Sequence, residues 1–514
     1  MRAVNCVYNN GDKGVYVVVL KRNIVANYVS QIYVALIGVA VLPLYIKHMG
    51  AEAYGLVGFF SMLQAWFTIL DLGLTPTIGR ETARFKSGVT DLLEYRRLFR
   101  ALSIVFLVIA AIGGGGILVL AQSVVSEWLH FEALDRKEVV FAVQLMGACV
   151  AFRWMGGLYR GVVTGNERLV WLSLFNVLIA TFRFIAVFVT MYAYGFTPKV
   201  FFIHQFVVAV IELLGLLIMA RRLLPSLDQS CNALGWSFAP IKSLLGFSLS
   251  IAFTSSVWVF VTQSDKLVLS GILSLAEYGH FTLAVLVAGG IMVLSGPLSN
   301  ALLPRLASLY AENRRSELVH LYRQATRFVA VLVGSISIVL ALCAKPLLMI
   351  WTGDKELAEA ASPILTLYAS GNGFLTLAAF PYYLQYARGD LRYHLIGSVV
   401  TVLLLIPAII FAARNYGGVG AGWAWLLING AFFFAWVTYV HYKLEPGLQW
   451  RWLVADCLKV LVPTGLVIWF MVNNIDFSTE RWVALIQVAS VGLLALLVSF
   501  ISSGGLDFIK SKLK

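Results

Sequence analysis

Charged residues are scarce in this chain of 514 amino acids: Asp, Glu, Lys and Arg make up 13% of it, whereas hydrophobic residues make up 60%. Soluble domains carry about 25% charged residues, so a chain of soluble domains is excluded. The mean hydropathy is +0.83. Apolar runs of about 20 residues recur along the sequence, which is typical of helices that cross a membrane. The sequence therefore predicts an all-α polytopic membrane protein.

The sequence also lacks the motifs of common enzymes and metal proteins. Its five cysteines are scattered, and no His/Cys set has the spacing of a metal site. It has no P-loop, and the stretch 417–422 fails the dinucleotide-binding pattern, so we expect its glycines to permit close helix packing. No loop is long enough for a nucleotide-binding domain. We therefore expect no enzyme, no cofactor and no metal, and any transport must be secondary or facilitated.

The net charge of +13 does not indicate nucleic-acid binding, because most basic residues lie in short connections between apolar runs. Fourteen spans are expected, at about residues 24–46, 54–77, 101–121, 139–159, 169–194, 200–220, 244–270, 278–298, 328–350, 363–386, 394–413, 420–440, 453–472 and 482–501. With the N-terminus inside, the inner connections hold 27 of the 39 Lys and Arg residues and the outer ones hold 8. This bias predicts that both termini are cytoplasmic.

Four pairs of identical residues share an offset of 224 positions, which indicates an internal duplication. They are Tyr54 and Tyr278, Gly55 and Gly279, Gly165 and Gly389, and Arg168 and Arg392. Six spans per half is an even number, so the repeat is parallel, and such repeats place a substrate site at their interface. We expect an N-terminal cytoplasmic segment (1–20), two six-helix lobes (21–222 and 243–443) joined by a cytoplasmic linker (223–242), and two extra helices with a tail (444–514).

Charged residues inside the predicted spans are the candidates for function, because a charge at the bilayer centre costs about 2.5 kcal/mol or more. The substrate-cavity candidates are Arg153, Arg183, Glu212, Asp265, Lys266 and Asp71. Structural alternatives stay open, and Arg153, near the inner end of its span, would reach lipid headgroups. Glu212 would only balance an arginine, Asp265 and Lys266 would form an ion pair, and Asp71 would cap helix packing near the interface. Lys459 is expected to snorkel to the inner surface.

Helical spacing groups some of these candidates with other polar residues. Asn176, Arg183 and Thr190 recur every seven residues and so form one polar stripe, with Arg183 near mid-depth. Gln205 and Glu212 share a face by the same spacing. The depth of Arg183 favours a cavity, because a deep arginine cannot easily snorkel.

Four short segments together resemble a known family. They are Glu52-Ala53-Tyr54-Gly55, Asp71-Leu72-Gly73-Leu74, Asp265-Lys266-Leu267 and Ala276-Glu277-Tyr278-Gly279. Over about residues 21–443 the chain resembles the polysaccharide-biosynthesis transporters, the bacterial O-antigen and capsule flippases. Their superfamily also includes multidrug extrusion proteins and the lipid II flippase. Family members are often described with twelve spans, so the last two helices are a departure.

The resemblance implies a flippase of the bacterial inner membrane that moves an undecaprenyl-diphosphate-linked oligosaccharide to the outer leaflet. Its partners would be this lipid-linked oligosaccharide, membrane lipids, and a polysaccharide polymerase or other assembly proteins. Two alternatives stay open: a cation-coupled multidrug exporter of the same fold, and a non-transporting membrane subunit of a polysaccharide assembly complex. Deep Arg and Lys side chains disfavour cationic drugs. The short outer connections disfavour a polymerase.

Overall fold

The computed structural model describes residues 10–225, 239–293 and 296–505. Across these ranges every regular element is a helix, and the sole β-type pairing is an isolated bridge between His130 and Ser274. The all-α prediction is therefore confirmed. The predicted N-terminal segment, the linker and the tail lie partly outside the described residues, at 1–9, 226–238 and 506–514.

The described helices agree with a multi-pass membrane protein. Eleven helical segments are long and apolar enough to cross a membrane. One of them, Arg392–Leu444, contains a break at Gly417 (φ 59°, ψ −144°), and therefore covers two of the predicted spans. Two more long helices, α10 (Ala239–Ser270) and α16 (Lys355–Ala378), coincide with further predicted spans. The helices are thus consistent with the predicted fourteen crossings.

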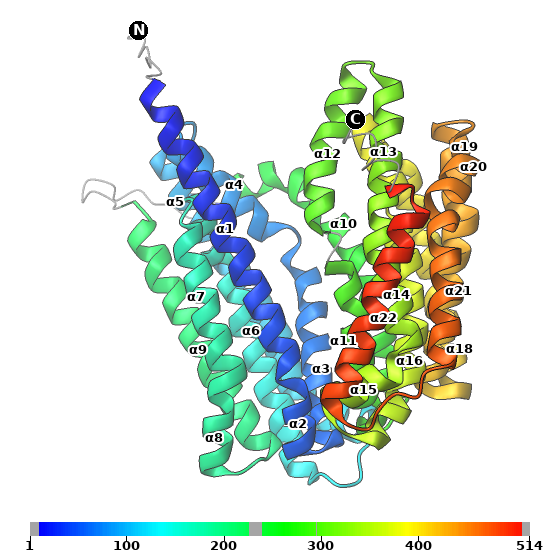
Figure 1. The fold of residues 1–514 in the computed structure, drawn as a ribbon. Helices are drawn as coiled ribbons and strands as arrows, with labels where there is room; N and C mark the ends of the chain where they lie inside the picture. Colours follow the sequence, from blue (N-terminus) through cyan, green and yellow to red (C-terminus); the bar gives the residue numbers. More distant parts are fainter. Residues whose placement is uncertain (1–9, 226–238, 294–295, 506–514) are drawn as a thin grey trace. The chain divides into compact units, whose positions relative to one another are not determined.

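The chain forms two compact units. The first comprises Met1–Gly50, Phe60–Glu127 and Ala133–Ser256. Its elements are α1 (Asn10–Ala40), α2 (Leu42–Met49), the C-terminal part of α3 (Ala51–Phe67), η1 (Thr68–Asp71), α4 (Leu74–Lys86), α5 (Leu92–Ser123), most of η2 (Val124–Trp128), α6 (Arg136–Gly165), α7 (Leu169–Thr181), η3 (Phe182–Ala186), α8 (Val187–Tyr194), α9 (Pro198–Leu223) and the first part of α10. Figure 1 shows these long helices running side by side.

Helix α6 is the centre of the first unit and packs against α4, α5 and α9. Glycine permits its close approach to α5. A Cβ atom on Gly114 would lie 3.0 Å from the carbonyl oxygen of Gly147, and the reverse distance is also 3.0 Å. This contact gives Gly114 and Gly147 a packing role between the two helices. It also brings the backbone of α6 close enough for its polar side chains to reach neighbouring helices.

The second predicted span is interrupted in the structure. Helix α3 ends at Phe67 and tightens into the 3₁₀ turn η1. Leu72 and Gly73 then adopt left-handed conformations, with φ of 47° and 69°, before α4 begins at Leu74. The Asp71–Leu74 segment is therefore a break between two helices. Asp71 stabilises the start of α4, because its carboxylate accepts hydrogen bonds from the backbone N–H and the hydroxyl of Thr75.

The second unit comprises Ala51–Phe59, Trp128–Glu132 and Val257–Lys514. Its further elements are α11 (Leu275–Val293), α12 (Gly296–Ala311), α13 (Arg315–Val329), η4 (Ala330–Gly334), α14 (Ser335–Leu342), α15 (Ala344–Thr352), α16, α17 (Phe380–Arg388), α18 (Arg392–Ala431), η5 (Phe432–Trp436), α19 (Val437–Leu444), α20 (Leu448–Trp450), η6 (Arg451–Leu458), α21 (Lys459–Asn473) and α22 (Arg481–Ser502). Helix α16 packs against α11, α14 and α18.

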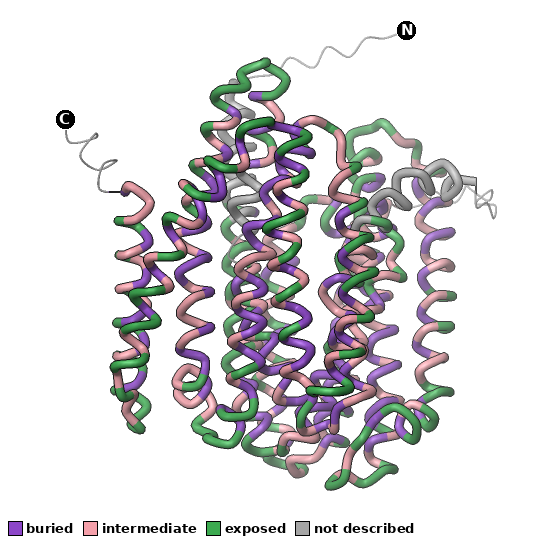
Figure 2. The backbone as a smooth tube through the Cα atoms, turned by 90° about the vertical axis from the view of Figure 1, so that its right-hand side faces the viewer, coloured by how far each residue is buried: buried purple, intermediate pink, exposed green. Residues whose placement is uncertain are grey.

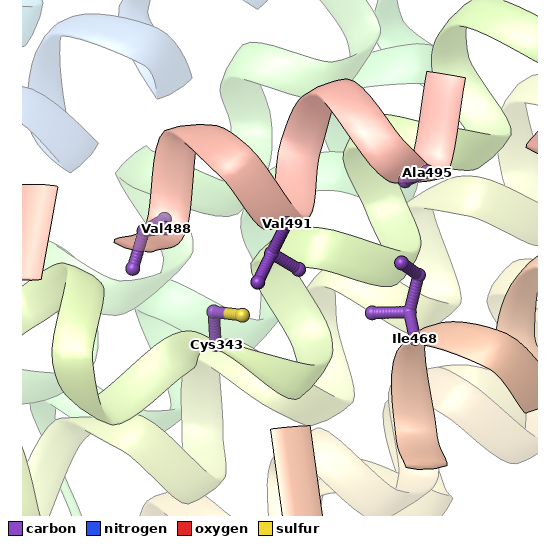
Figure 3. Packing of buried hydrophobic residues seen from close by; sticks show 5 residues of the cluster. All are labelled: Cys343, Ile468, Val488, Val491 and Ala495. Carbon is purple, nitrogen blue, oxygen red and sulfur yellow. The ribbon is translucent and has the colours of Figure 1, made fainter. Parts of the chain in front are cut away.

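The last two long helices belong to the second unit. Helices α21 and α22 pack against each other and against α14, and the buried residues Cys343, Ile468, Val488, Val491 and Ala495 form the contact (Figure 3). A chain of buried hydroxyl groups adds polar contacts, since Ser499 Oγ lies 2.7 Å from Ser335 Oγ and 2.8 Å from Thr464 Oγ1. Hydrogen-bonded hydroxyls of this kind join helices inside a bilayer.

Large apolar side chains stay exposed along the helices. Exposed segments alternate with buried ones along the coloured parts of the helices in Figure 2, and on α5 the side chains of Ile112 and Val119 are 70% and 81% exposed. Apolar faces of this extent suit a hydrocarbon environment, in which the helical backbone already satisfies its own hydrogen bonds.

Candidate functional site

Three arginines of the first unit surround one carboxylate, that of Glu212 on α9. Arg183 donates from Nη2 to Glu212 Oε2 at 2.8 Å, and Arg160 donates from Nη2 to Oε1 at 3.1 Å. The Nε atom of Arg153 lies 4.0 Å from Oε2. The side chains of Arg153 and Glu212 are each 10% exposed, that of Arg183 is 24% exposed and that of Arg160 is 34% exposed. We call Arg153, Arg160, Arg183 and Glu212 the arginine cluster.

The register between α6 and α9 builds this cluster. Arg153 and Arg160 are seven residues apart on α6, and Gln205 and Glu212 are seven residues apart on α9. Because seven residues make about two helical turns, each pair lies on one face of its helix. Arg153 Nη2 donates to Gln205 Oε1 at 2.9 Å. The contact of Arg160 with Glu212 joins the same two helices two turns further along.

Arg153 is held firmly by its neighbours. Besides Gln205, its Nη1 donates to Gln64 Oε1 of α3 at 2.6 Å, and its guanidinium carbon lies 5.0 Å from the centroid of the Phe60 ring. An arginine over an aromatic ring gains a cation–π interaction, which strengthens when water is excluded. These contacts fix the arginine that is most deeply buried.

Arg183 lies on a π-helical turn, η3, that interrupts α7 and α8. Such a turn shifts the backbone hydrogen bonds by one residue and leaves carbonyl groups that need other donors. Two side chains of α9 supply them: His204 Nε2 lies 2.9 Å from the carbonyl oxygen of Phe182, and Gln205 Nε2 donates to that of Arg183 at 3.0 Å. His204 Nδ1 lies 2.9 Å from the Thr190 hydroxyl. These bonds set the direction in which Arg183 leaves its helix.

The polar stripe on the fifth predicted span does face its partner helices. Asn176 Oδ1 accepts a hydrogen bond from Arg160 Nη1 at 2.8 Å, Arg183 reaches Glu212, and Thr190 contacts His204. All three members of the stripe therefore point toward α6 or α9, as the seven-residue spacing predicts.

The charges and donors of the arginine cluster are not balanced within the described protein. Three guanidinium charges less one carboxylate charge leave a net charge of +2. Among the described residues, the buried Nε–H groups of Arg153 and Arg183 have no hydrogen-bond partner. Buried donors are normally paired, so unpaired charged donors mark a place where a ligand oxygen or water completes the bonding.

The other candidates lie elsewhere. Asp71 is bonded to Thr75, as described above. In the second unit, Asp265 is 1% exposed and accepts a hydrogen bond from the Tyr368 hydroxyl at 2.9 Å. Lys266 Nζ lies 3.4 Å from Asp265 Oδ1 and donates to the carbonyl oxygen of Thr262 at 2.7 Å. For Asp71, Asp265 and Lys266 a cavity role stays a prediction, because the hydrogen bonds described above join them to other groups of the protein.

Sequence reasoning assigned Arg160 to an inner connection and so missed its role in the cluster. The signal was present, because Arg160 follows Arg153 by the same seven residues that separate Gln205 and Glu212. Gln64 and His204 were also missed. Neither carries a charge that marks it as costly inside a membrane. Over the described residues, no group of three or more His, Cys, Asp or Glu side chains has the geometry to hold a metal ion.

Comparison with solved structures shows which known proteins share this fold. It superposes on the lipid II flippase MurJ in an inward closed conformation with a TM-score of 0.68 and 15% sequence identity, over 96% of this chain and 99% of that one. It superposes on an inward-facing multidrug resistance transporter of the MATE family, of the MOP superfamily, with a TM-score of 0.62 and 13% identity, over 82% and 95% of the two chains. The chain thus shares its fold with these two membrane transporters.

The sequence then gives the family. The profile of the polysaccharide biosynthesis protein family matches residues 20–310, which is more than half of the chain. The protein belongs to this family, and the resemblance found in its short motifs is confirmed. A putative O-antigen transporter of Shigella flexneri is 20% identical over 410 residues, which cover 79% of this chain and 93% of that protein.

Proposed function

We propose that this protein is a flippase that moves an undecaprenyl-diphosphate-linked oligosaccharide from the inner to the outer leaflet of the bacterial inner membrane. The observation that carries the proposal is the arginine cluster, with its net charge of +2 and its two unpaired buried Nε–H donors. Family membership supports a substrate used in polysaccharide assembly. The fold of known flippases and exporters supports transport rather than catalysis.

The chemistry of the cluster matches a diphosphate. A diphosphate carries about two negative charges, and each would cost several kcal/mol to carry through hydrocarbon. A guanidinium group stays charged in any such setting and binds a phosphate through two parallel hydrogen bonds. The arginines therefore lower the cost of bringing the headgroup to membrane depth, while the lipid tail stays in the bilayer.

The same cluster disfavours the multidrug alternative. A cationic drug would need an acidic pocket, whereas the cluster has an excess of positive charge. The third alternative, a membrane subunit that does not transport, predicts that substitutions in the cluster leave polysaccharide export unchanged at equal protein levels. The experiment on Arg183 below distinguishes this alternative from transport.

The orientation belongs to the proposal. Both termini and residues 80–100 face the cytoplasm, since 27 of the 39 basic residues then lie inside. An inside-negative membrane potential would help to move negative charge outward, by about 2.3 kcal/mol per charge per 100 mV. Reporter fusions at Lys86 and Lys514 should both read as cytoplasmic, and a reading outside at either position would overturn the orientation.

The experiment that tests the function is a substitution series at Arg183 in cells whose surface glycan depends on this protein. Arg183→Lys keeps the charge but loses the two-pronged contact, Arg183→Ala loses both, and Arg183→Glu also repels the phosphate. We expect surface-glycan output to fall in the order wild type, Lys, Ala, Glu at equal protein levels in the membrane. The matched control is Arg392→Ala, because Arg392 is 80% exposed and pairs with Asp390. Normal output from Arg183→Glu would contradict the proposal.

A further inference from the structure

We propose that Glu212 occupies the place of the ligand's phosphate in the empty site. Its carboxylate pairs with the arginines while no ligand is bound, the phosphate displaces it on binding, and the carboxylate pairs with the arginines again after release. This inference rests on the proposed function and adds a regulatory role for one residue of the same site. It starts from an excess of donors, because three guanidinium groups converge on a carboxylate that has two oxygens.

The two oxygens of Glu212 are already engaged. Oε1 accepts from Arg160 and Oε2 accepts from Arg183, while the Nε of Arg153, at 4.0 Å, is beyond hydrogen-bond distance. A diphosphate offers more acceptor oxygens than a carboxylate and binds arginine through two parallel bonds. It can therefore satisfy donors that Glu212 leaves unpaired, among them the buried Nε–H groups of Arg153 and Arg183.

Charge explains why a substitute is needed. Without Glu212, three guanidinium groups would face one another in a partly buried site, and uncompensated buried charge is strongly destabilising. With Glu212 the empty site carries +2. A ligand with about two negative charges then makes the group neutral, so the site accepts a diphosphate without a further counter-ion.

The members of the cluster differ in how freely they can change partners. Arg153 is 10% exposed and is held by Gln64, Gln205 and the ring of Phe60. Arg160 and Arg183 are 34% and 24% exposed, and each donates to Glu212. Arg153 therefore stays in place, while Arg160 and Arg183 transfer from the carboxylate to the phosphate.

Competition by Glu212 limits how tightly the ligand binds. A transport site has to bind its ligand well enough to load and weakly enough to release it. Removal of the carboxylate charge should therefore tighten binding and slow release. A purely structural Glu212 predicts the opposite, because arginines without their partner would lose their positions and bind more weakly.

The test measures binding of geranyl diphosphate, a water-soluble prenyl diphosphate, to the purified full-length protein by calorimetry. We expect Glu212→Gln to bind about tenfold more tightly than the wild type, equal to about 1.4 kcal/mol, and to give less surface glycan in cells. The matched control is Glu445→Gln, because Glu445 is also buried and paired with two arginines, Arg315 and Arg388. This control should bind as the wild type does.

Unchanged or weaker binding by Glu212→Gln would overturn the exchange role. If that variant does not fold, Glu212→Asp decides: its shorter carboxylate keeps the charge but reaches the arginines less well, so tighter binding supports exchange and unchanged or weaker binding overturns it. Arg183→Ala separates the two proposals. Equal binding by Arg183→Ala and the wild type would refute the anion site itself, whereas loss of binding in Arg183→Ala without tightening in Glu212→Gln would refute the exchange alone.

Discussion

Gly55 and Gly279 make the same contact in opposite directions. A Cβ atom on Gly55 would collide with the carbonyl oxygen of Leu275, and one on Gly279 would lie 2.8 Å from the carbonyl oxygen of Ala51. Leu275 follows Ala51 by 224 positions, the offset that also relates the two glycines. Helices α3 and α11 therefore cross in a reciprocal manner, which is the pattern of a two-fold contact between equivalent segments. The crossing supports the internal duplication.

The reciprocal contact predicts different effects for Tyr54 and Tyr278. The Tyr54 hydroxyl is hydrogen-bonded to Thr282. The equivalent partner of Tyr278 would be residue 58, which is a glycine, and within the described chain the buried Tyr278 hydroxyl has no partner. We expect Tyr54→Phe to lower the free energy of unfolding by about 1 kcal/mol and Tyr278→Phe to leave it equal or raise it.

Thermal unfolding of the purified protein in detergent measures both substitutions of this tyrosine pair. Each replacement removes one hydroxyl from a fully buried ring, so the two variants control for each other. A larger loss of stability in Tyr278→Phe than in Tyr54→Phe would contradict the assignment of partners.

The close crossing predicts that added volume at Gly279 is destabilising. In Gly279→Ala the methyl group would meet backbone atoms of α3, which cannot move aside as a side chain can, so we expect a loss of about 1–3 kcal/mol. Gly289 lies on the same helix, and a Cβ atom there meets no described atom within 4 Å. Gly289→Ala should therefore be neutral or stabilising by up to about 1 kcal/mol. Thermal unfolding should separate the two variants, and equal stability would argue against the crossing.

Gln205 is predicted to position both Arg153 and Arg183. Its Oε1 accepts from Arg153 and its Nε2 donates to the backbone of the π-helical turn. Gln205→Leu removes both bonds and leaves buried polar groups unpaired, which should lower the free energy of unfolding by about 1–3 kcal/mol. We expect the folded fraction of this variant to bind geranyl diphosphate more weakly than the wild type does, because the two arginines are no longer held in position.

Gln205→Glu gives a sharper comparison, because it keeps an acceptor for Arg153 and loses the donor to the Arg183 carbonyl. Binding should be weaker than in the wild type, since the new carboxylate also competes with the ligand for Arg153. The control is Gln31→Leu, because Gln31 is exposed and bonds Asn27 on its own helix. Wild-type binding in Gln205→Leu would remove Gln205 from the site.

Asp456 is predicted to anchor the helices that follow η6. This fully buried carboxylate accepts from Arg323 Nε at 2.6 Å and lies 2.8 Å from Arg327 Nε, both on α13. Loss of one partner of a buried ion pair lowers the free energy of unfolding by about 3–5 kcal/mol. Because Arg323 and Arg327 are partly exposed, we expect the loss in Asp456→Asn to lie near the lower end of this range. Asp390→Asn is the control, because its partner Arg392 is 80% exposed, and we expect this substitution to change the unfolding temperature little. Equal unfolding temperatures for the two variants would contradict the anchoring role.

Much of the fold could be predicted from hydropathy, because apolar runs long enough to cross a bilayer are visible in the sequence. The break at Leu72 and Gly73 was harder to place, since left-handed residues sit inside an apolar run and change its composition little. The π-helical turn that carries Arg183 leaves no compositional sign at all. Its stabilising partners, His204 and Gln205, lie on the next helix and are recognised only from the contacts.

The candidate site was partly predictable for a similar reason. Arg153, Arg183 and Glu212 stand out because charges are costly at membrane depth, and the structure brings these three together. Arg160 was missed because the predicted span ended at residue 159, so a shift of a single residue decided whether it counted as intramembrane. The hydrogen bond of Asp265 to Tyr368 joins positions 103 residues apart, which no local pattern reveals. The lobe boundaries stay a prediction.

The most direct test of transport is flipping of a labelled lipid-diphosphate oligosaccharide in proteoliposomes. The purified protein is reconstituted with the labelled lipid in both leaflets, and an impermeant glycosidase added outside reports how quickly sugar from the inner leaflet becomes accessible. The central claim predicts that the wild type exposes nearly all of the label, whereas Arg183→Glu exposes only the outer-leaflet half, as protein-free vesicles do. Equal exposure by the wild type and Arg183→Glu, or no exposure beyond that of protein-free vesicles, would contradict it.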